Sequence, residues 1–404
     1  MIDVAVDFVS NLIKKVKPSA TIAVSMKSAE LRAAGKDVIG LGAGEPDFDT
    51  PDHIKAAAIE AINQGKTKYT AVDGTPELKK AIVDKFKREN HLDFNANQVL
   101  VSCGAKHSIS NLLAAVLNPS DEVIIPAPYW VSYPDMVLLA GGESVIVNTT
   151  QEQDFKISPE QLENAITDKT RIIILNTPSN PTCKAYRKSE LQALGEVLLK
   201  YPQLLIATDD IYEHIYWGDE EITNLGVLFP ELMDRMVFIN GVSKAYAMTG
   251  WRIGYAAGSV DVITAMRKVQ SQATSNPCSI SQAASVAALN GSQDCLVPMK
   301  KAFKERHDWL IKALNDVPGF SCIPGEGAFY AFPNVEQAIA KIDGVQTDVE
   351  FSTWLLENAE VAVVPGTPFG APGHVRLSFA TSMENLQNAV KRINTVLKTS
   401  KHVP

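Results

Sequence analysis

Short β-branched runs alternate with longer stretches of helical spacing through the middle of the chain. Seven of these runs predict strands, over residues 99–102, 123–125, 144–147, 172–175, 204–208, 237–240 and 253–257. The segments between them predict helices, and two have clear starts, because Thr75 and Ser158 can each cap a helix whose first position is the proline that follows. We therefore expect βαβ crossovers and an α/β fold with a mostly parallel seven-stranded sheet covered by helices.

The pattern changes after about residue 292. A charged amphipathic helix is expected over residues 299–314, and a final helix over residues 383–397. Between them the chain has short apolar runs, at residues 329–332, 361–364 and 375–379. This order predicts a smaller α+β unit packed against the sheet, since no repeat or low-complexity linker separates the two parts.

The chain of 404 residues is longer than one ordinary domain of about 150 residues. We expect a large domain over residues 51–292 and a small domain that combines residues 1–50 with residues 293–404. Hydrophobic residues make up 46% of the chain and charged residues 21%, which excludes a wholly disordered or collagen-like chain.

The net charge and the cysteine content exclude further classes of protein. The net charge of −8 argues against a nucleic-acid partner, and no apolar stretch approaches the roughly 18 to 20 residues of a membrane span. The five cysteines are odd in number and form no C-x-x-C pair, so neither a disulfide framework nor a metal site is predicted. We expect a protein of the reducing cytoplasm, and the first 17 residues have no secretory apolar region.

The first candidate site is the segment from Ser102 to Ser108, where a predicted strand turns through Gly104 into an apolar helix. Free N–H groups at such a helix start can hold a phosphate. On its own the segment favours an ordinary strand-to-helix turn, and it lacks the Walker spacing. The pair Gly42 and Gly44 also fails the dinucleotide-binding pattern, because Asp47 stands where the third glycine should be.

Three further residues carry possible chemistry. Asp209 ends a predicted strand and can face a cationic ligand or cap a helix. Lys244 lies among small residues, where desolvation would lower its pKa and favour the nucleophilic amine, although most lysines are simply solvated. Arg376 lies on an alternating apolar strand and needs an anion, which is either a substrate carboxylate or an internal acidic residue.

Taken together, in this order and spacing, the segments resemble the class I aminotransferases, which are pyridoxal-phosphate enzymes of fold type I. The resemblance covers nearly the whole chain, and the most similar subgroup is that of the bacterial aspartate aminotransferases. Its most specific motifs are KPSAT, LGAGEPDFDTP, NTPSNPT, DDIYEH, SKAYAMTGWRIGY and GHVRLSFATS.

The resemblance implies the roles of five residues around the cofactor ring. Lys244 corresponds to the lysine that binds pyridoxal 5′-phosphate covalently and then moves the substrate proton. Asp209 corresponds to the carboxylate that keeps the pyridine nitrogen protonated. Tyr212 and Asn180 resemble the hydrogen-bond partners of the ring hydroxyl, and Trp130 resembles the aromatic residue that stacks on the ring.

Phosphate binding is implied for the turn and for two side chains. The backbone N–H groups of Gly104, Ala105 and Lys106 would bind the phosphate, and Ser243 and Arg252 would add side-chain donors.

Tyr69 matches a residue that in this family reaches the phosphate of the neighbouring subunit. The resemblance therefore implies a homodimer whose active sites are shared between subunits.

Substrate binding is implied for the same region. Arg376 would bind the α-carboxylate, with the backbone of Gly44 nearby and with Trp130 and Asn180 against the substrate. The expected activity is transfer of an amino group from L-aspartate, or a related amino acid, to 2-oxoglutarate in a ping-pong cycle. Aromatic or prephenate aminotransferase activity, a lyase on the same fold and a non-catalytic binding protein are the alternatives.

The distal carboxylate of a dicarboxylic substrate is assigned by the same resemblance to Lys106, with help from Lys17 and Thr21. Two places depart from the family pattern. The stretch Ala71-Val-Asp73 differs from the usual proline- and alanine-containing form at the rim of the site, and Cys183 stands where glycine usually follows Asn180-Pro-Thr. A turn with positive φ strains a cysteine, so we expect altered loop geometry there without the loss of a ligand group.

Overall fold

The computed structural model describes residues 8–399, with a seven-stranded sheet in the order β2-β8-β7-β6-β5-β3-β4. Its strands are β2 (Val99–Ser102), β3 (Glu122–Ala127), β4 (Glu143–Asn148), β5 (Thr170–Asn176), β6 (Leu205–Asp209), β7 (Met236–Gly241) and β8 (Gly254–Gly258). Within it, β8 runs antiparallel to both of its neighbours and the other pairs are parallel. The predicted strands and the mostly parallel sheet are confirmed.

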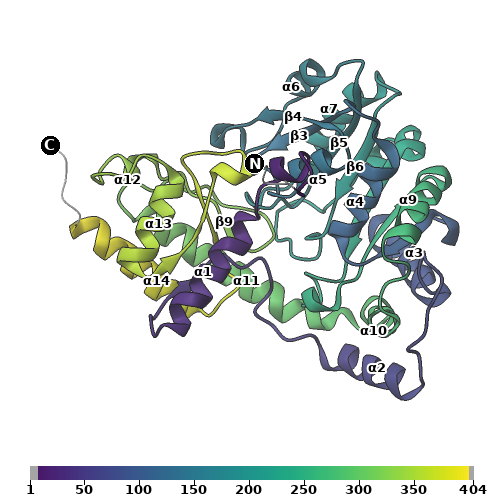
Figure 1. Cartoon of the computed structure of the whole chain (residues 1–404), viewed down its shortest axis with the longest axis horizontal. Helices are drawn as coiled ribbons and strands as arrows, with labels where there is room; N and C mark the ends of the chain where they lie inside the picture. Colours follow the sequence, from purple (N-terminus) through teal and green to yellow (C-terminus); the bar gives the residue numbers. More distant parts are fainter. Residues whose placement is uncertain (1–7, 400–404) are drawn as a thin grey trace, which may run out of the picture.

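Helices cover both faces of this sheet (Figure 1). Successive side chains of a strand point to opposite faces, so Ile172 and Ile174 belong to one buried cluster and Ile173 and Leu175 to another. The first cluster includes side chains of α4 (Ala105–Val116), α5 (Tyr133–Leu139) and α9 (Val260–Ala273). The second includes side chains of α2 (Asp52–Asn63), α3 (Pro76–Asn90), α7 (Lys188–Leu199) and α10 (Ser279–Asn290).

Both predicted helix starts are confirmed. The Thr75 hydroxyl accepts a hydrogen bond from the backbone N–H of Leu78 at 3.3 Å, at the start of α3. The Ser158 hydroxyl does the same for Gln161 at 3.1 Å, at the start of α6 (Pro159–Ala165).

The C-terminal part has its own buried core, built on α11 (Leu296–Asn315), α13 (Asp348–Ala359) and α14 (Met383–Thr399). Its three-stranded antiparallel sheet contains β9 (Tyr330–Ala331), β11 (Val364–Pro365) and β12 (Val375–Ser378). The helix α1 (Ala20–Ala33) lies beside this part although it comes early in the chain (Figure 1).

The apolar run at residues 361–364 does not form one continuous strand. This run forms two short strands, because β10 (Val361–Ala362) pairs in parallel with β1 (Ile39–Gly40), whereas β11 pairs with β12. The domain boundaries stay a prediction, and residues 1–7 and 400–404 of the expected small domain lie outside the described residues.

The remaining helical elements are short. The α-helical ones are α8 (Leu225–Leu228) and α12 (Glu336–Ile339). The 3₁₀ turns are Ile13–Lys15, Ala96–Gln98, Gln151–Gln153, Pro230–Arg235, Thr249–Trp251, Gln293–Cys295 and Thr367–Phe369. Among residues 8–399, no helix combines the length and the apolar character that crossing a bilayer requires.

Candidate active site

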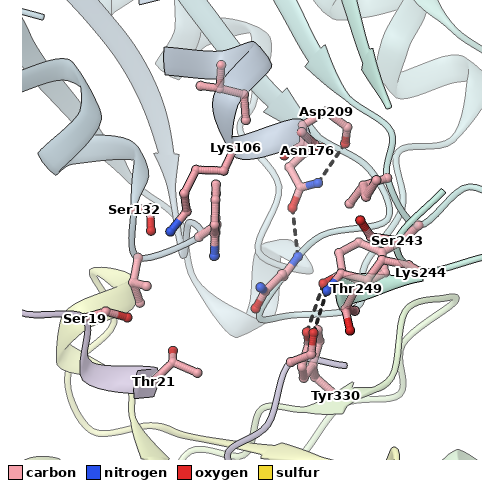
Figure 2. A pocket seen from close by; sticks show the side chains of 18 of the residues that line it. Ser19, Thr21, Lys106, Ser132, Asn176, Asp209, Ser243, Lys244, Thr249 and Tyr330 are labelled. Atoms are coloured by element: carbon pink, nitrogen blue, oxygen red, sulfur yellow. Dashed lines mark hydrogen bonds between the residues drawn. The ribbon is translucent and has the colours of Figure 1, made fainter. Parts of the chain in front are cut away.

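A cavity of about 300 Å³ lies where β2, β5, β6 and β7 end, the edge at which open α/β sheets bind ligands (Figure 2). Most of the residues singled out in the sequence line it. They are Thr21, Gly44, Ala105, Lys106, Trp130, Asn180, Asp209, Tyr212, Ser243, Lys244, Arg252 and Arg376. The topology thus gathers segments that are more than 350 residues apart in the chain.

The turn between β2 and α4 forms one wall of the cavity. Gly104 is the N-cap of α4 with φ of 91°, and a side chain there would collide with the guanidinium of Arg252. That guanidinium donates to the backbone oxygens of Thr249 at 2.9 Å and Cys103 at 3.3 Å. The unpaired N–H groups of the first helical turn and this arginine suit an anion, together with the hydroxyl of Ser243.

Asp209 ends β6 and is 5% exposed. Its Oδ2 accepts a hydrogen bond of 2.6 Å from the hydroxyl of Tyr133, whereas its Oδ1 is buried without a partner. Burial raises the pKa of this carboxyl from 3.8 to about 6, although the hydrogen bond from Tyr133 lowers it. An unpaired carboxylate oxygen in a buried wall suits a cationic ligand atom.

Lys244 follows β7, and its Nζ donates to the backbone oxygen of Gly44 at 2.5 Å. Burial lowers the pKa of this amine from 10.5 to about 8. The positive charges of Arg376 and Arg252 lower it further, whereas Glu45 opposes the shift. The neutral form that a nucleophile or a base requires is therefore far more accessible near physiological pH than in a solvated lysine, although most of the amine stays protonated.

Arg376 lies on β12 and is 1% exposed. It donates to Oδ1 of Asn180 at 2.9 Å and to the backbone oxygen of Gly42 at 2.8 Å, while its Nε is buried without a partner. Among the residues that the structure describes, no carboxylate lies within ion-pair distance of the guanidinium. The alternative of an internal ion pair is therefore wrong, and the guanidinium has capacity for an external anion.

Two tyrosines meet at the floor of the cavity. The hydroxyls of Tyr212 and Tyr330 are 2.9 Å apart and share a hydrogen bond, and both side chains are buried. The guanidinium carbon of Arg376 lies 4.4 Å from the centre of the Tyr330 ring. Tyr330 thereby touches both a predicted cofactor-binding residue and the predicted substrate-binding arginine.

A second cation faces the cavity from α4. The Nζ of Lys106 lies 4.9 Å from the centre of a Trp130 ring, and burial lowers the pKa of this amine. Thr21 and Ser19 line the same side (Figure 2).

Three of the predicted site residues do not line the cavity of their own chain. Tyr69 is 91% exposed, and Lys17 is exposed, with its backbone N–H donating to Asp135 at 3.3 Å. Gly104 does not line the cavity either, but it shapes the turn beneath it.

Behind the cavity, a buried ionic network ties two of the strand ends together. Lys85 is fully buried and binds the carboxylate of Glu213, which also accepts a hydrogen bond of 2.6 Å from Asn240. The nearby Glu89 pairs with His214 at 2.9 Å. The ammonium of Lys85 lies between the carboxylates of Glu213 and Glu89. Since Glu213 follows Asp209 and Asn240 precedes Lys244, the network fixes these two segments relative to each other.

Three residues near the cavity were missed by the sequence reasoning. Tyr133 binds Asp209, and Tyr330 binds Tyr212. Asn176 donates to the backbone oxygen of Asp209 at 2.7 Å (Figure 2). Asn176 ends β5, one residue beyond the expected strand, so the strand-end argument used for Asp209 could have found it. The two tyrosines give no local signal, since each reaches its partner only through tertiary packing.

Comparison with known proteins identifies the family. The model of the family "Aminotransferase class I and II" matches residues 36–393. The chain belongs to the class I and II aminotransferases. An aspartate/prephenate aminotransferase of Nitrosomonas europaea is 58% identical to this aminotransferase over 393 residues, covering 96% of this chain and 99% of the relative. An aspartate aminotransferase of Bacillus subtilis is 51% identical over 376 residues, covering 93% and 95%.

Solved structures agree with this family. The aspartate aminotransferase of Rhizobium meliloti has a TM-score of 0.94 and 46% identity, covering 97% of this chain and 99% of that one. The aspartate aminotransferase of Thermus thermophilus with maleate has a TM-score of 0.92 and 42% identity, covering 97% and 100%. The predicted fold type is thereby confirmed.

Class I and II aminotransferases depend on pyridoxal 5′-phosphate, and the residues present fit this cofactor. The orphaned Oδ1 of Asp209 suits a protonated pyridine nitrogen. The start of α4, with Arg252 beside it, suits the phosphate, and the side-chain-free Gly104 leaves room for the guanidinium. The amine of Lys244 lies in the same cavity.

Proposed function

We propose that this aminotransferase moves the amino group of L-aspartate to 2-oxoglutarate. The observation that carries the proposal is the pair of cations in the cavity, Arg376 from β12 and Lys106 from α4, which suits the two carboxylates of a dicarboxylic substrate. The names of the relatives from N. europaea and B. subtilis support aspartate as donor. No specific observation favours a lyase or a non-catalytic binding protein.

The bound cofactor supplies an electron sink that stabilises negative charge at the substrate α-carbon. Asp209 would hold a proton on the pyridine nitrogen through its free Oδ1, while Tyr133 fixes its other oxygen. Tyr212 and Asn180 would donate to the ring hydroxyl, and Trp130 would pack against the ring.

Phosphate binding would fall to the backbone N–H groups of Ala105 and Lys106 with the side chains of Ser243 and Arg252. The predicted donation by Gly104 is wrong, because its N–H already donates to the backbone oxygen of Ser102 at 2.7 Å. Ala105, Lys106, Ser243 and Arg252 all line the cavity, as does Asp209, so one cavity would hold both the phosphate and the ring of the cofactor.

Arg376 would bind the α-carboxylate in a bidentate manner, because its guanidinium is oriented by Asn180 and Gly42 and carries no internal counter-ion. The substrate α-carbon would then lie within reach of Lys244. Its Nζ would take the α-proton and hold it for return, as a base whose pKa is lowered to about 8 by burial. The nitrogen left by aspartate would pass to 2-oxoglutarate in the second half of the cycle.

Three further predictions belong to this proposal. The exposed Tyr69 would contact the phosphate in the neighbouring subunit, so we propose a homodimer with shared active sites. Residues 51–292 would form the large domain and residues 1–50 and 293–404 the small one. The cytoplasmic location stays a prediction.

The half-reaction tests the proposal most directly. The visible absorbance of the purified protein is recorded, and L-aspartate is added without any oxo acid. We expect the cofactor spectrum to change while oxaloacetate forms in an amount equal to that of the enzyme. A change with L-phenylalanine alone would leave the aminotransferase chemistry intact and contradict the proposed donor.

A further inference from the structure

The loop that carries Asn180 contains a cysteine in a conformation that favours glycine. Cys183 has φ of 60° and is 0% exposed. A β-carbon is strained there, and glycine would be free of this strain. Burial raises the pKa of the Cys183 thiol, so the sulfur is neutral. A reactive role is not indicated, and the question is what the side chain does in its place.

The sulfur has a specific partner. Sγ of Cys183 accepts a hydrogen bond of 3.1 Å from the backbone N–H of Tyr330, which is 147 residues away. Tyr330 begins β9, an edge strand of the order β11-β12-β9. A buried N–H at a sheet edge needs an acceptor from outside the sheet, and the sulfur supplies one.

The other hydrogen bonds of Cys183 do not depend on its side chain. Its backbone oxygen accepts from the N–H groups of Glu326 at 2.8 Å and Gly327 at 3.1 Å, and its own N–H donates to Ser179 at 2.9 Å. Any residue at this position makes these backbone bonds. Beyond its packing in the core, the side chain therefore contributes the hydrogen bond to Tyr330, which glycine cannot make.

Tyr330 is the residue through which this contact reaches the cavity. Its hydroxyl shares a hydrogen bond of 2.9 Å with Tyr212, and its ring lies 4.4 Å from the guanidinium carbon of Arg376. A shift of the Tyr330 backbone would move the ring against the guanidinium and lengthen the bond to Tyr212.

We propose that Cys183 is a positioning residue whose sulfur fixes Tyr330, and through it Arg376 and Tyr212, for substrate binding. This role rests on the proposed function of Arg376 as the carboxylate-binding residue. The strained backbone of Cys183 is tolerated because the side chain supplies the acceptor that β9 needs.

Three substitutions separate the acceptor from the backbone strain. C183S keeps a β-carbon and an acceptor, C183A keeps only the β-carbon, and C183G removes both and relaxes the loop. C322A is the matched control, because Cys322 is a buried cysteine of the same core cluster and lines no part of the cavity. Each holoenzyme is measured for its Kd for maleate, its KM and kcat with L-aspartate, and the pH dependence of the cofactor absorbance without substrate.

One lost hydrogen bond contributes about two- to tenfold in affinity. We expect the Kd for maleate and the KM for aspartate to rise by this factor in C183A and C183G, with a smaller change in kcat, and to stay within about twofold in C183S and C322A. The pH midpoint of the cofactor absorbance should move in the alanine and glycine variants, because Tyr212 loses its fixed partner.

Other outcomes overturn the proposal. Wild-type affinity and an unmoved pH midpoint in C183G would show that the sulfur positions nothing. Equal losses in C183A and C183S would show that a hydrogen-bond acceptor at this position is not what matters, and would assign the effect to packing of the sulfur in the core. If C183A does not fold, C183G carries the test. A wild-type enzyme that binds no maleate would count against the proposed function. The pH midpoint of the cofactor absorbance would then still test whether Cys183 positions Tyr330 and Tyr212.

Discussion

The hydroxyl of Tyr133 donates a hydrogen bond of 2.6 Å to Oδ2 of Asp209, although 76 residues separate the two in the chain. This bond orients the carboxylate and leaves Oδ1 as its unpaired oxygen. It also opposes the effect of burial, which raises the pKa of Asp209 to about 6. The tyrosine therefore helps to keep the carboxylate charged at neutral pH, the state that a protonated pyridine nitrogen requires.

Replacing this tyrosine tests the relationship. In Y133F the carboxyl of Asp209 loses a donor that lowers its pKa, so the acidic limb of the pH–rate profile should move to higher pH. We expect kcat/KM at pH 7 to fall about tenfold, as a change of about 1.4 kcal/mol would give. The measurement is kcat/KM for aspartate between pH 5 and pH 8. Y129F is the control, because Tyr129 makes no hydrogen bond to Asp209, and coincident acidic limbs would contradict the prediction.

The buried ammonium of Lys244 should destabilise the folded protein when no cofactor is bound. The fall of its pKa from 10.5 to about 8 corresponds to about 3 kcal/mol. The unfolded chain holds this proton up to pH 10.5 and the folded one only to about pH 8, so the wild type gains stability as pH rises through this window. K244M removes the effect. The variant also loses the hydrogen bond to Gly44, which costs about 1 kcal/mol. We therefore expect its free energy of unfolding at pH 7 to exceed that of the wild type by about 2 kcal/mol.

Urea unfolding of both cofactor-free proteins between pH 7 and pH 10.5 checks this prediction. The difference between the two isolates Lys244, since every other group titrates in both. The stability advantage of K244M should shrink as pH rises, and a constant difference would contradict it. K244M should also lack aminotransferase activity.

The sequence predicts the sheet well because burial on both faces makes its inner strands continuous apolar runs, which end at recognisable polar residues such as Asp209. The run at residues 361–364 shows the limit, since an apolar pattern does not reveal that neighbouring residues pair with different strands. The site is predicted where a motif carries the chemistry. Tyr133 and Tyr330 act through contacts that form only in the folded chain, so their own segments look like ordinary core.

The ionic network behind the cavity should be necessary for stability. K85M would leave the buried carboxylate of Glu213 without its cation, and loss of one partner of a buried pair costs about 3–5 kcal/mol. K80M is the matched control on the same helix, because Lys80 is 76% exposed and pairs with Asp84 at the surface. The control should lie within about 0.5 kcal/mol of the wild type by urea unfolding. Equal stability of the two variants would show that the network contributes nothing.

Mixed dimers test whether the active sites are shared. If Tyr69 acts in the neighbouring subunit, Y69F and K244A impair different halves of each site. A hybrid dimer then has one intact site, formed by Lys244 of the Y69F subunit and Tyr69 of the K244A subunit. We expect the mixture, after unfolding and refolding together, to exceed the mean activity of the two separate variants. Activity equal to that mean, with dimers seen by sedimentation, would show that Tyr69 does not act across the interface.

Lys106 should set the preference for dicarboxylic substrates. Its ammonium lies 4.9 Å from the centre of a Trp130 ring and faces the cavity, whereas Arg376 serves the α-carboxylate that all amino acids share. K106A removes the partner of the distal carboxylate only. We expect the KM for aspartate to rise about tenfold or more, because a charge-assisted hydrogen bond contributes about 1.5–3 kcal/mol, and the KM for phenylalanine to change little. K27A, on α1 outside this cavity, is the control. Equal losses for both donors would assign Lys106 to cofactor binding alone, since a weakened phosphate site affects every substrate alike.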